Sequence, residues 1–108
     1  MEVAAGLIKL QTSHQETLAE WQQRMNESVE QVTASLKNEQ VMVESWFKLE
    51  IESNSYLLWY MRAESLEKAV QAFQASTAEI DIFHMQSIVK MAEGSEQIFA
   101  QPLLDFSA

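Results

Sequence analysis

The sequence predicts an α+β fold in which helices cover one face of an antiparallel β-sheet. One long segment repeats its apolar residues at the 3.6-residue period of a helix, and the next segment changes to the two-residue period of a strand. The expected order of elements is strand, helix, strand, strand, helix, helix, strand. This is the βαββαβ order of a ferredoxin-like domain with an extra helix before the last strand. With 108 residues, the chain is expected to form a single domain, residues 1–108.

The first part of the chain is expected to form a strand and one long helix. Residues 2–11 form a short, largely apolar segment followed by polar residues, which is typical of a strand. Gly6 within it indicates a bulge or a neighbour packed close to the backbone. Ser13 followed by Glu16 has the spacing of a capping box, which marks a helix start. Apolar residues then recur every three or four positions until Asn38, which can end a helix: Leu18, Trp21, Met25, Val29, Val32 and Leu36.

A β-hairpin is expected next. Residues 41–52 alternate between two faces, and residues 56–63 are rich in aromatic and aliphatic side chains. The dipeptide Ser53-Asn54 fits a tight turn between them, because Asn tolerates positive φ. With this turn, Trp46 is expected to pair with Met61 on one face of the hairpin.

Both faces of this hairpin are apolar in either plausible register, and this predicts a dimer. Helices are expected to cover only one face of the sheet. Burial of each large side chain on the other face is worth about 1.5–3 kcal/mol, and that face is expected to carry Met42, Trp46, Leu57, Trp59 and Met61. Because the chain has no segment left to cover them, we expect a homodimer whose two sheets pack through a two-fold axis.

The C-terminal half is expected to hold two helices and a last strand. Ser65 can cap a helix, and Ser76 followed by Glu79 is a second capping-box spacing, so a break is expected near residues 75–77. One kinked helix is the alternative, because the apolar stripe continues across this point. Gly94 is expected to end the helical region, and residues 97–106 to form an edge strand, since Pro102 cannot donate a backbone hydrogen bond.

Three segments form a recognisable pattern: Glu44-Ser45-Trp46-Phe47, Tyr56-Leu57-Leu58-Trp59-Tyr60, and Ser76-Thr77 with Ile80-Asp81 and His84. The pattern resembles that of an uncharacterised bacterial family in the dimeric α+β barrel superfamily, and it spans most of the chain up to His84. The resemblance implies a ferredoxin-like subunit and a barrel dimer. The superfamily includes cofactor-independent monooxygenases, haem-degrading enzymes, isomerases and ligand-sensing domains, so the fold alone does not select a function.

Composition and charge exclude several classes of function. The formal net charge of -9 opposes binding to nucleic acid or to anionic membrane surfaces. The longest apolar runs, residues 3–8 and 56–61, are far shorter than the roughly 20 residues of a membrane-spanning helix. The N-terminus lacks the features of a secretion signal, so a cytoplasmic protein is expected. Without cysteines and with two histidines, neither a metal nor a cofactor is expected, and no phosphate-binding glycine loop or GxSxG turn is present.

His84 is the first candidate for chemistry. It lies on the apolar stripe of its expected helix, and Asp81 lies one turn earlier, where its carboxylate could orient the imidazole or raise its pKa. A general base or a haem ligand has this arrangement. The alternative is a histidine that packs between helices, with an aspartate placed to suit the helix dipole. His14 has no partner identifiable from the sequence and is expected at the surface.

Glu44 is the second candidate, because it shares a strand face with Trp46, and burial beside a large aromatic ring raises the pKa of a carboxyl group. Such a group could take a proton from a phenolic or enolic substrate. The alternative is an ion pair with Arg62 or Lys48 at the edge of a dimer. The candidate ligand-binding residues are Trp46, Trp59, Tyr60, Met61 and Arg62, although aromatic residues at strand spacing also serve as core or interface.

Two functions follow from these candidates, and the sequence leaves open whether the protein is an enzyme. The first is a homodimeric module that binds a small apolar molecule, or has a purely structural role, without catalysis. The second is a cofactor-independent monooxygenase or isomerase that acts on a small aromatic or polyketide-like compound. In the second, His84 or Glu44 is the base and Trp46 and Trp59 hold the substrate.

Overall fold

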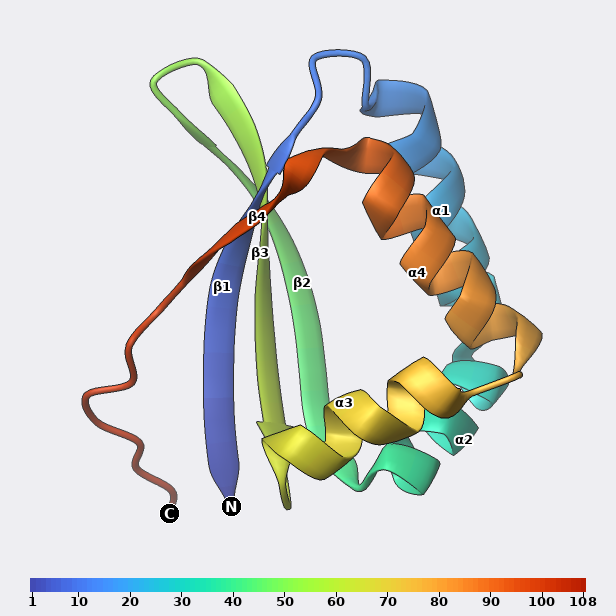
Figure 1. Ribbon diagram of the computed structural model, residues 1–108, viewed down its shortest axis with the longest axis vertical. Helices are drawn as coiled ribbons and strands as arrows, with labels where there is room; N and C mark the ends of the chain where they lie inside the picture. Colours follow the sequence, from blue (N-terminus) through green and yellow to red (C-terminus); the bar gives the residue numbers. More distant parts are fainter.

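The computed structural model describes residues 1–108 and confirms the predicted α+β class. The elements are β1 (Glu2–Leu10), α1 (Gln15–Glu27), α2 (Val29–Glu39), β2 (Val41–Ile51), β3 (Asn54–Ala63), α3 (Leu66–Ala75), α4 (Glu79–Met91) and β4 (Ala92–Phe99). The four strands form one antiparallel sheet in the order β2-β3-β1-β4. All four helices lie on the same side of this sheet (Figure 1). No helix combines the length and the apolar character needed to cross a membrane.

The long N-terminal helix is interrupted at Ser28, where the expected single helix becomes α1 and α2. The backbone angles of Ser28 are φ -112° and ψ 33°, outside the helical range. The break lets α1 pack against α4 and α2 pack against α3. The predicted capping box does not form: the helix starts at Gln15, after His14, and no side chain caps it. The C-terminal cap is Gln40, with φ 58°, and not Asn38.

The hairpin turn lies one residue earlier than predicted. Glu52 and Ser53 both have positive φ, 50° and 69°, as the two central residues of a type I′ turn require. Trp46 therefore pairs with Trp59 and not with Met61. The pairing differs from the prediction by two residues, and because side chains alternate with a period of two, the residues predicted to share one face of the hairpin still share it, with different partners across the strands.

The predicted assignment of the two faces is wrong. The face that carries Trp46, Leu57, Trp59 and Met61 is covered by the helices, and Leu57 is only 2% exposed. Trp46 and Trp59 pack against a core that contains Ile8, Leu10, Trp21, Leu57 and Met91. The open face is also apolar, with Val43, Phe47, Ile51 and Ile98 each more than 40% exposed. Both faces suit burial, so their composition alone could not identify the one that the helices cover.

The C-terminal part differs from the prediction in its boundaries. The break between α3 and α4 is confirmed, and Ser65 caps α3 by accepting a hydrogen bond from the Lys68 backbone N–H at 3.3 Å. Helix α4 ends at Met91 and not at Gly94, because the Gln11 backbone N–H donates to the Met91 carbonyl at 2.8 Å. Gly94 instead lies within β4 with φ 76°. It occupies the irregular stretch where the pairing with β1 shifts register. Strand β4 ends at Phe99, so Pro102 lies beyond the sheet.

Candidate functional site

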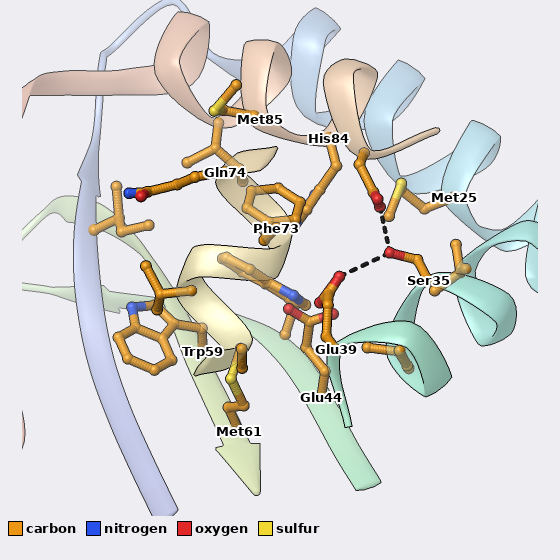
Figure 2. Close-up of a pocket in the computed structure, with 18 of the residues that line it drawn as sticks. Met25, Ser35, Glu39, Glu44, Trp59, Met61, Phe73, Gln74, His84 and Met85 are labelled. Carbon is orange, nitrogen blue, oxygen red and sulfur yellow. Dashed lines mark hydrogen bonds between the residues drawn. The ribbon is translucent and has the colours of Figure 1, made fainter. Parts of the chain in front are cut away.

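A cavity of about 480 Å³ lies between the helix-covered face of the sheet and the helices (Figure 2). Of its 21 lining residues, 14 are hydrophobic. Its rim is also apolar, since Val89 of α4 and Phe99 of β4 are 70% and 71% exposed. Neither lysine nor arginine lines it, and its ionisable residues are Glu39, Glu44, Asp81 and His84. This size and lining are typical of a site for a small, largely apolar molecule.

His84 of α4 lies in an aromatic cluster at the back of the cavity. Its ring stacks on Trp21 at 5.9 Å between centroids and meets the rings of Trp46 and Phe73 edge-on at 5.2 and 5.8 Å. The Trp21 indole Nε1–H donates to His84 Nδ1 at 2.9 Å. Because Nδ1 accepts this hydrogen bond, the neutral ring carries its hydrogen on Nε2. His84 therefore offers a ligand an N–H donor.

The protonation state of His84 follows from its burial. The side chain is 8% exposed, and burial lowers its pKa from 6.5 to about 4, although the negative charge of Asp81 opposes the shift. The imidazole is therefore neutral at physiological pH and is a weak base. Asp81 makes no hydrogen bond to it, since its carboxylate is held by two serine hydroxyl groups, those of Ser35 and Ser76, each at 2.6 Å.

Glu44 of β2 is the one cavity carboxyl group without a serine partner. Its carboxyl group lies beside that of Glu39, which comes from the end of α2 (Figure 2). Burial is the main cause that raises the pKa of Glu44 from 4.5 to about 7, and the nearby carboxyl groups of Glu39 and Asp81 contribute to this rise. The Trp46 indole N–H lowers this pKa, but it makes no hydrogen bond of good geometry and is buried without an acceptor. Glu44 thus changes its charge near neutral pH.

Trp59 of β3 forms one wall of the cavity, and its position depends on Gly6. A Cβ atom on Gly6 would lie 2.9 Å from three atoms of the Trp59 indole ring. The indole Nε1–H donates to Gln97 Oε1 of β4 at 3.1 Å, and Phe99 meets the ring edge-on at 6.3 Å. The neighbour packed against Gly6, one of the two alternatives predicted, is therefore Trp59.

The cavity gathers six of the eight candidate site residues, namely Glu44, Trp46, Trp59, Met61, Asp81 and His84. The other two lie elsewhere. Arg62 donates to the Tyr60 hydroxyl at 3.2 Å and forms an ion pair with Asp105, on the face of the sheet opposite the cavity. Lys48 does not line this cavity. His14 is not at the surface as predicted: it is 4% exposed, and its Nδ1 lies 2.5 Å from the Gln11 carbonyl.

The sequence prediction missed several site residues, among them Ser35, Glu39 and Phe73. A signal for the first two was present, since Ser35 follows Val32 by three positions and Glu39 follows Leu36 by three. Both residues therefore share the core-facing side of their helix with the apolar stripe. Polar residues placed in this way are candidates for a buried site.

Comparisons with known proteins agree with this architecture. Residues 1–107 match a family described as a family of unknown function, DUF6176. The chain belongs to this family. A solved structure described as a putative antibiotic biosynthesis monooxygenase from Nitrosomonas europaea is similar, with a TM-score of 0.60 and 13% sequence identity. The match covers 96% of this chain and 100% of that one. No curated protein matches the sequence.

These findings confirm two predictions about the chain. Its fold is ferredoxin-like, with four antiparallel strands and helices on one face. Its membership of a family without an assigned function agrees with the resemblance to an uncharacterised family seen in the sequence.

Proposed function

We propose that the protein binds a small, neutral, largely apolar compound in the cavity and removes a proton from it with Glu44. The supporting observation is the position of Glu44, a carboxyl group without a serine partner in an apolar cavity, with a pKa of about 7. A general base works best when its pKa lies near the working pH, because it is then both ionised and basic enough to take the proton. A glutamate with a purely structural role would not have to lie in an apolar cavity without a serine partner.

His84 has a complementary role in this proposal. Removal of a proton next to a carbonyl group, or from a phenol, leaves negative charge on an oxygen atom. A neutral N–H donor that points at this oxygen atom stabilises such charge as it develops. The hydrogen bond from Trp21 to Nδ1 leaves the Nε2–H of His84 for this task. The sequence offered Glu44 and His84 as alternative bases, and in this proposal they have different functions. Glu44 accepts the proton, and His84 donates a hydrogen bond to the ligand oxygen that becomes negatively charged.

The substrate class follows from the lining of the cavity. With no lysine or arginine to pair with a phosphate or carboxylate group, the cavity suits an uncharged ketone, enol or phenol with an aromatic or polyketide-like body. Return of the proton to another carbon would make the protein an isomerase. Attack of the carbanion on dioxygen would make it a monooxygenase, the activity named for the similar structure from Nitrosomonas europaea. Product analysis distinguishes these two outcomes.

The experiment is hydrogen exchange of two enolisable probes, 2-tetralone and benzoylacetone, in D₂O followed by NMR. The wild-type protein should accelerate exchange of the acidic C–H, with a rate that rises with pH and reaches half its maximum near pH 7. Glu44→Gln should lower this rate by about 100-fold or more. Glu50→Gln, on the same strand but exposed, should leave it unchanged. Binding of the probes without faster exchange would contradict the proposal and favour a binding module without catalysis.

We also propose that two copies of the chain pair through the open face of the sheet. Helices cover the other face, and the exposed side chains of Val43, Phe47, Ile51 and Ile98 give this face an apolar character that water-exposed sheets rarely have. The pairing would complete the α+β barrel expected from the sequence. The cavity lies on the opposite side of the sheet, so it remains accessible in such a dimer.

A further inference from the structure

Ser35 has one hydroxyl hydrogen but two carboxyl neighbours. Its Oγ lies 2.8 Å from Glu39 Oε2 and 2.6 Å from Asp81 Oδ1. A serine hydroxyl group can donate only one hydrogen bond. If both carboxyl groups were ionised, one of these short contacts would join two oxygen atoms with no hydrogen between them. One of the two carboxyl groups therefore carries a proton and donates it to Ser35.

The surroundings of the two groups indicate that Glu39 holds this proton. Glu39 is the last residue of α2, where the helix dipole disfavours negative charge, and burial raises its pKa. Asp81 lies in the first turn of α4, where the dipole favours negative charge, and it also accepts a hydrogen bond from Ser76 at 2.6 Å. The hydrogen bonds then run in one direction, from Glu39 to Ser35 and from Ser35 to Asp81.

This chain of hydrogen bonds links the cavity to the protein surface. At the inner end, the carboxyl group of Glu39 lies beside that of Glu44 (Figure 2). At the outer end, Ser76 lies in the linker between α3 and α4 and is partly exposed to solvent. The groups come from β2, α2, α4 and this linker, and no basic side chain lines the cavity to neutralise them.

We propose that Glu39, Ser35 and Asp81 form a proton relay that connects Glu44 to solvent at Ser76. The proposal rests on the role of Glu44 as proton acceptor. When Glu44 has taken a proton from a ligand, it passes that proton to Glu39 as Glu39 gives its own to Ser35. Ser35 gives its hydrogen to Asp81. The Ser76 hydroxyl group, which donates to Asp81 in the resting state, then rotates towards solvent, so that it can accept a proton from Asp81 as it gives its own hydrogen to water. One proton leaves the ligand, one enters the solvent, and each relay group keeps its starting protonation state; rotation of the hydroxyl and carboxyl groups then restores the resting directions of the hydrogen bonds.

The first test detects the held proton without any ligand, by infrared spectroscopy at pH 8. Glu44 is ionised at this pH, so the carbonyl stretch of a protonated carboxylic acid should come from the relay alone. Glu39→Gln should abolish the band and Glu44→Gln should retain it. Ser35→Ala should shift the band, because the acid loses its hydrogen bond, and Ser35→Thr should restore the wild-type position. Absence of the band from the wild-type protein would overturn the relay.

The second test measures proton transfer with 2-tetralone in D₂O. A proton taken by Glu44 must be replaced by a deuteron before it returns to the ligand, or no deuterium is incorporated. Ser35→Ala should therefore slow incorporation by about tenfold or more at saturating 2-tetralone, and Ser35→Thr should retain the rate. Equal rates in the wild type and Ser35→Ala would overturn the relay but leave the proposed base intact. Exchange absent from the wild type as well would overturn the base instead.

Discussion

Burial shifts the pKa values of two cavity residues, Glu44 and His84, in opposite directions. The pKa of Glu44 rises from 4.5 to about 7, so the folded state binds a proton more tightly than the unfolded state over this interval. Stability from this group is present below pH 4.5 and is lost as the pH rises to about 7. The pKa of His84 falls from 6.5 to about 4, so its contribution is present above pH 6.5 and is lost on acidification towards pH 4. Between pH 4.5 and 6.5 the two effects oppose each other.

Replacement of Glu44 should reveal this opposition. Glu44→Gln removes a carboxylate that is costly to bury, so the variant should be more stable than the wild type at pH 8 by about 1–3 kcal/mol. From pH 6.5 to 4 it should lose stability more steeply than the wild type, because the effect of His84 is no longer offset. Urea denaturation from pH 8 to pH 4 measures both the higher stability of the variant at pH 8 and its steeper loss of stability below pH 6.5. Glu50→Gln is the control, and a Glu44→Gln profile parallel to the wild type would show that Glu44 is not perturbed.

The sequence predicted those site residues that share one strand face or one helix stripe. Glu44, Trp46 and Trp59 were found because a period of two places them together, and His84 because it interrupts an apolar stripe. The partner of His84 could not be found in this way. Trp21 is 63 positions away, and their contact depends on the packing of α1 against α4. Periodicity describes one element at a time and cannot give such contacts.

At the scale of elements, the sequence predicted helices and strands better than their ends. The hairpin turn was misplaced by one residue because Glu52 has positive φ, which its residue type does not suggest. The end of α4 was misplaced because Gly94 does not end the helix but lies in the irregular part of β4. The last carbonyl group of the helix, that of Met91, accepts a hydrogen bond from the Gln11 backbone N–H, which comes from another segment. Both boundaries are set by the pairing of strands, which a local pattern does not contain.

Gly6 offers a test of how one strand position sets the cavity wall. Gly6→Ala would place a methyl group 2.9 Å from the Trp59 ring, so the indole must move and the protein should lose about 1–3 kcal/mol of stability. Tryptophan fluorescence and thermal denaturation measure the two effects. Gly94→Ala is the matched control: with φ 76° it should also destabilise the protein, but with no atom near its Cβ it should leave the fluorescence unchanged. Unchanged fluorescence in Gly6→Ala would contradict the proposed role of Gly6.

At the scale of the whole molecule, an exchanged assignment of faces still led to the same expectation of a dimer. The sequence showed that both sides of the hairpin are apolar, but it could not show which side the helices take, because that depends on how α1 and α4 pack together. Because the two faces are exchanged, the candidate site lies in a different part of the molecule from the one predicted. Trp46 and Trp59 line a cavity within one subunit, beneath the helices, and do not lie between two sheets.

Pairing through the open face is tested by one charged substitution. Phe47 is 54% exposed on β2, and its burial against a second copy would stabilise the dimer by about 1.5–3 kcal/mol per side chain. Phe47→Asp would place a carboxylate there on each subunit, so it should convert a wild-type dimer into a monomer, as measured by size-exclusion chromatography with light scattering at micromolar concentration. Val29→Asp, at a residue 60% exposed on α2, should remain dimeric. A monomeric wild-type protein would rule out the pairing, whereas a dimeric Phe47→Asp variant would show that the interface lies on another surface.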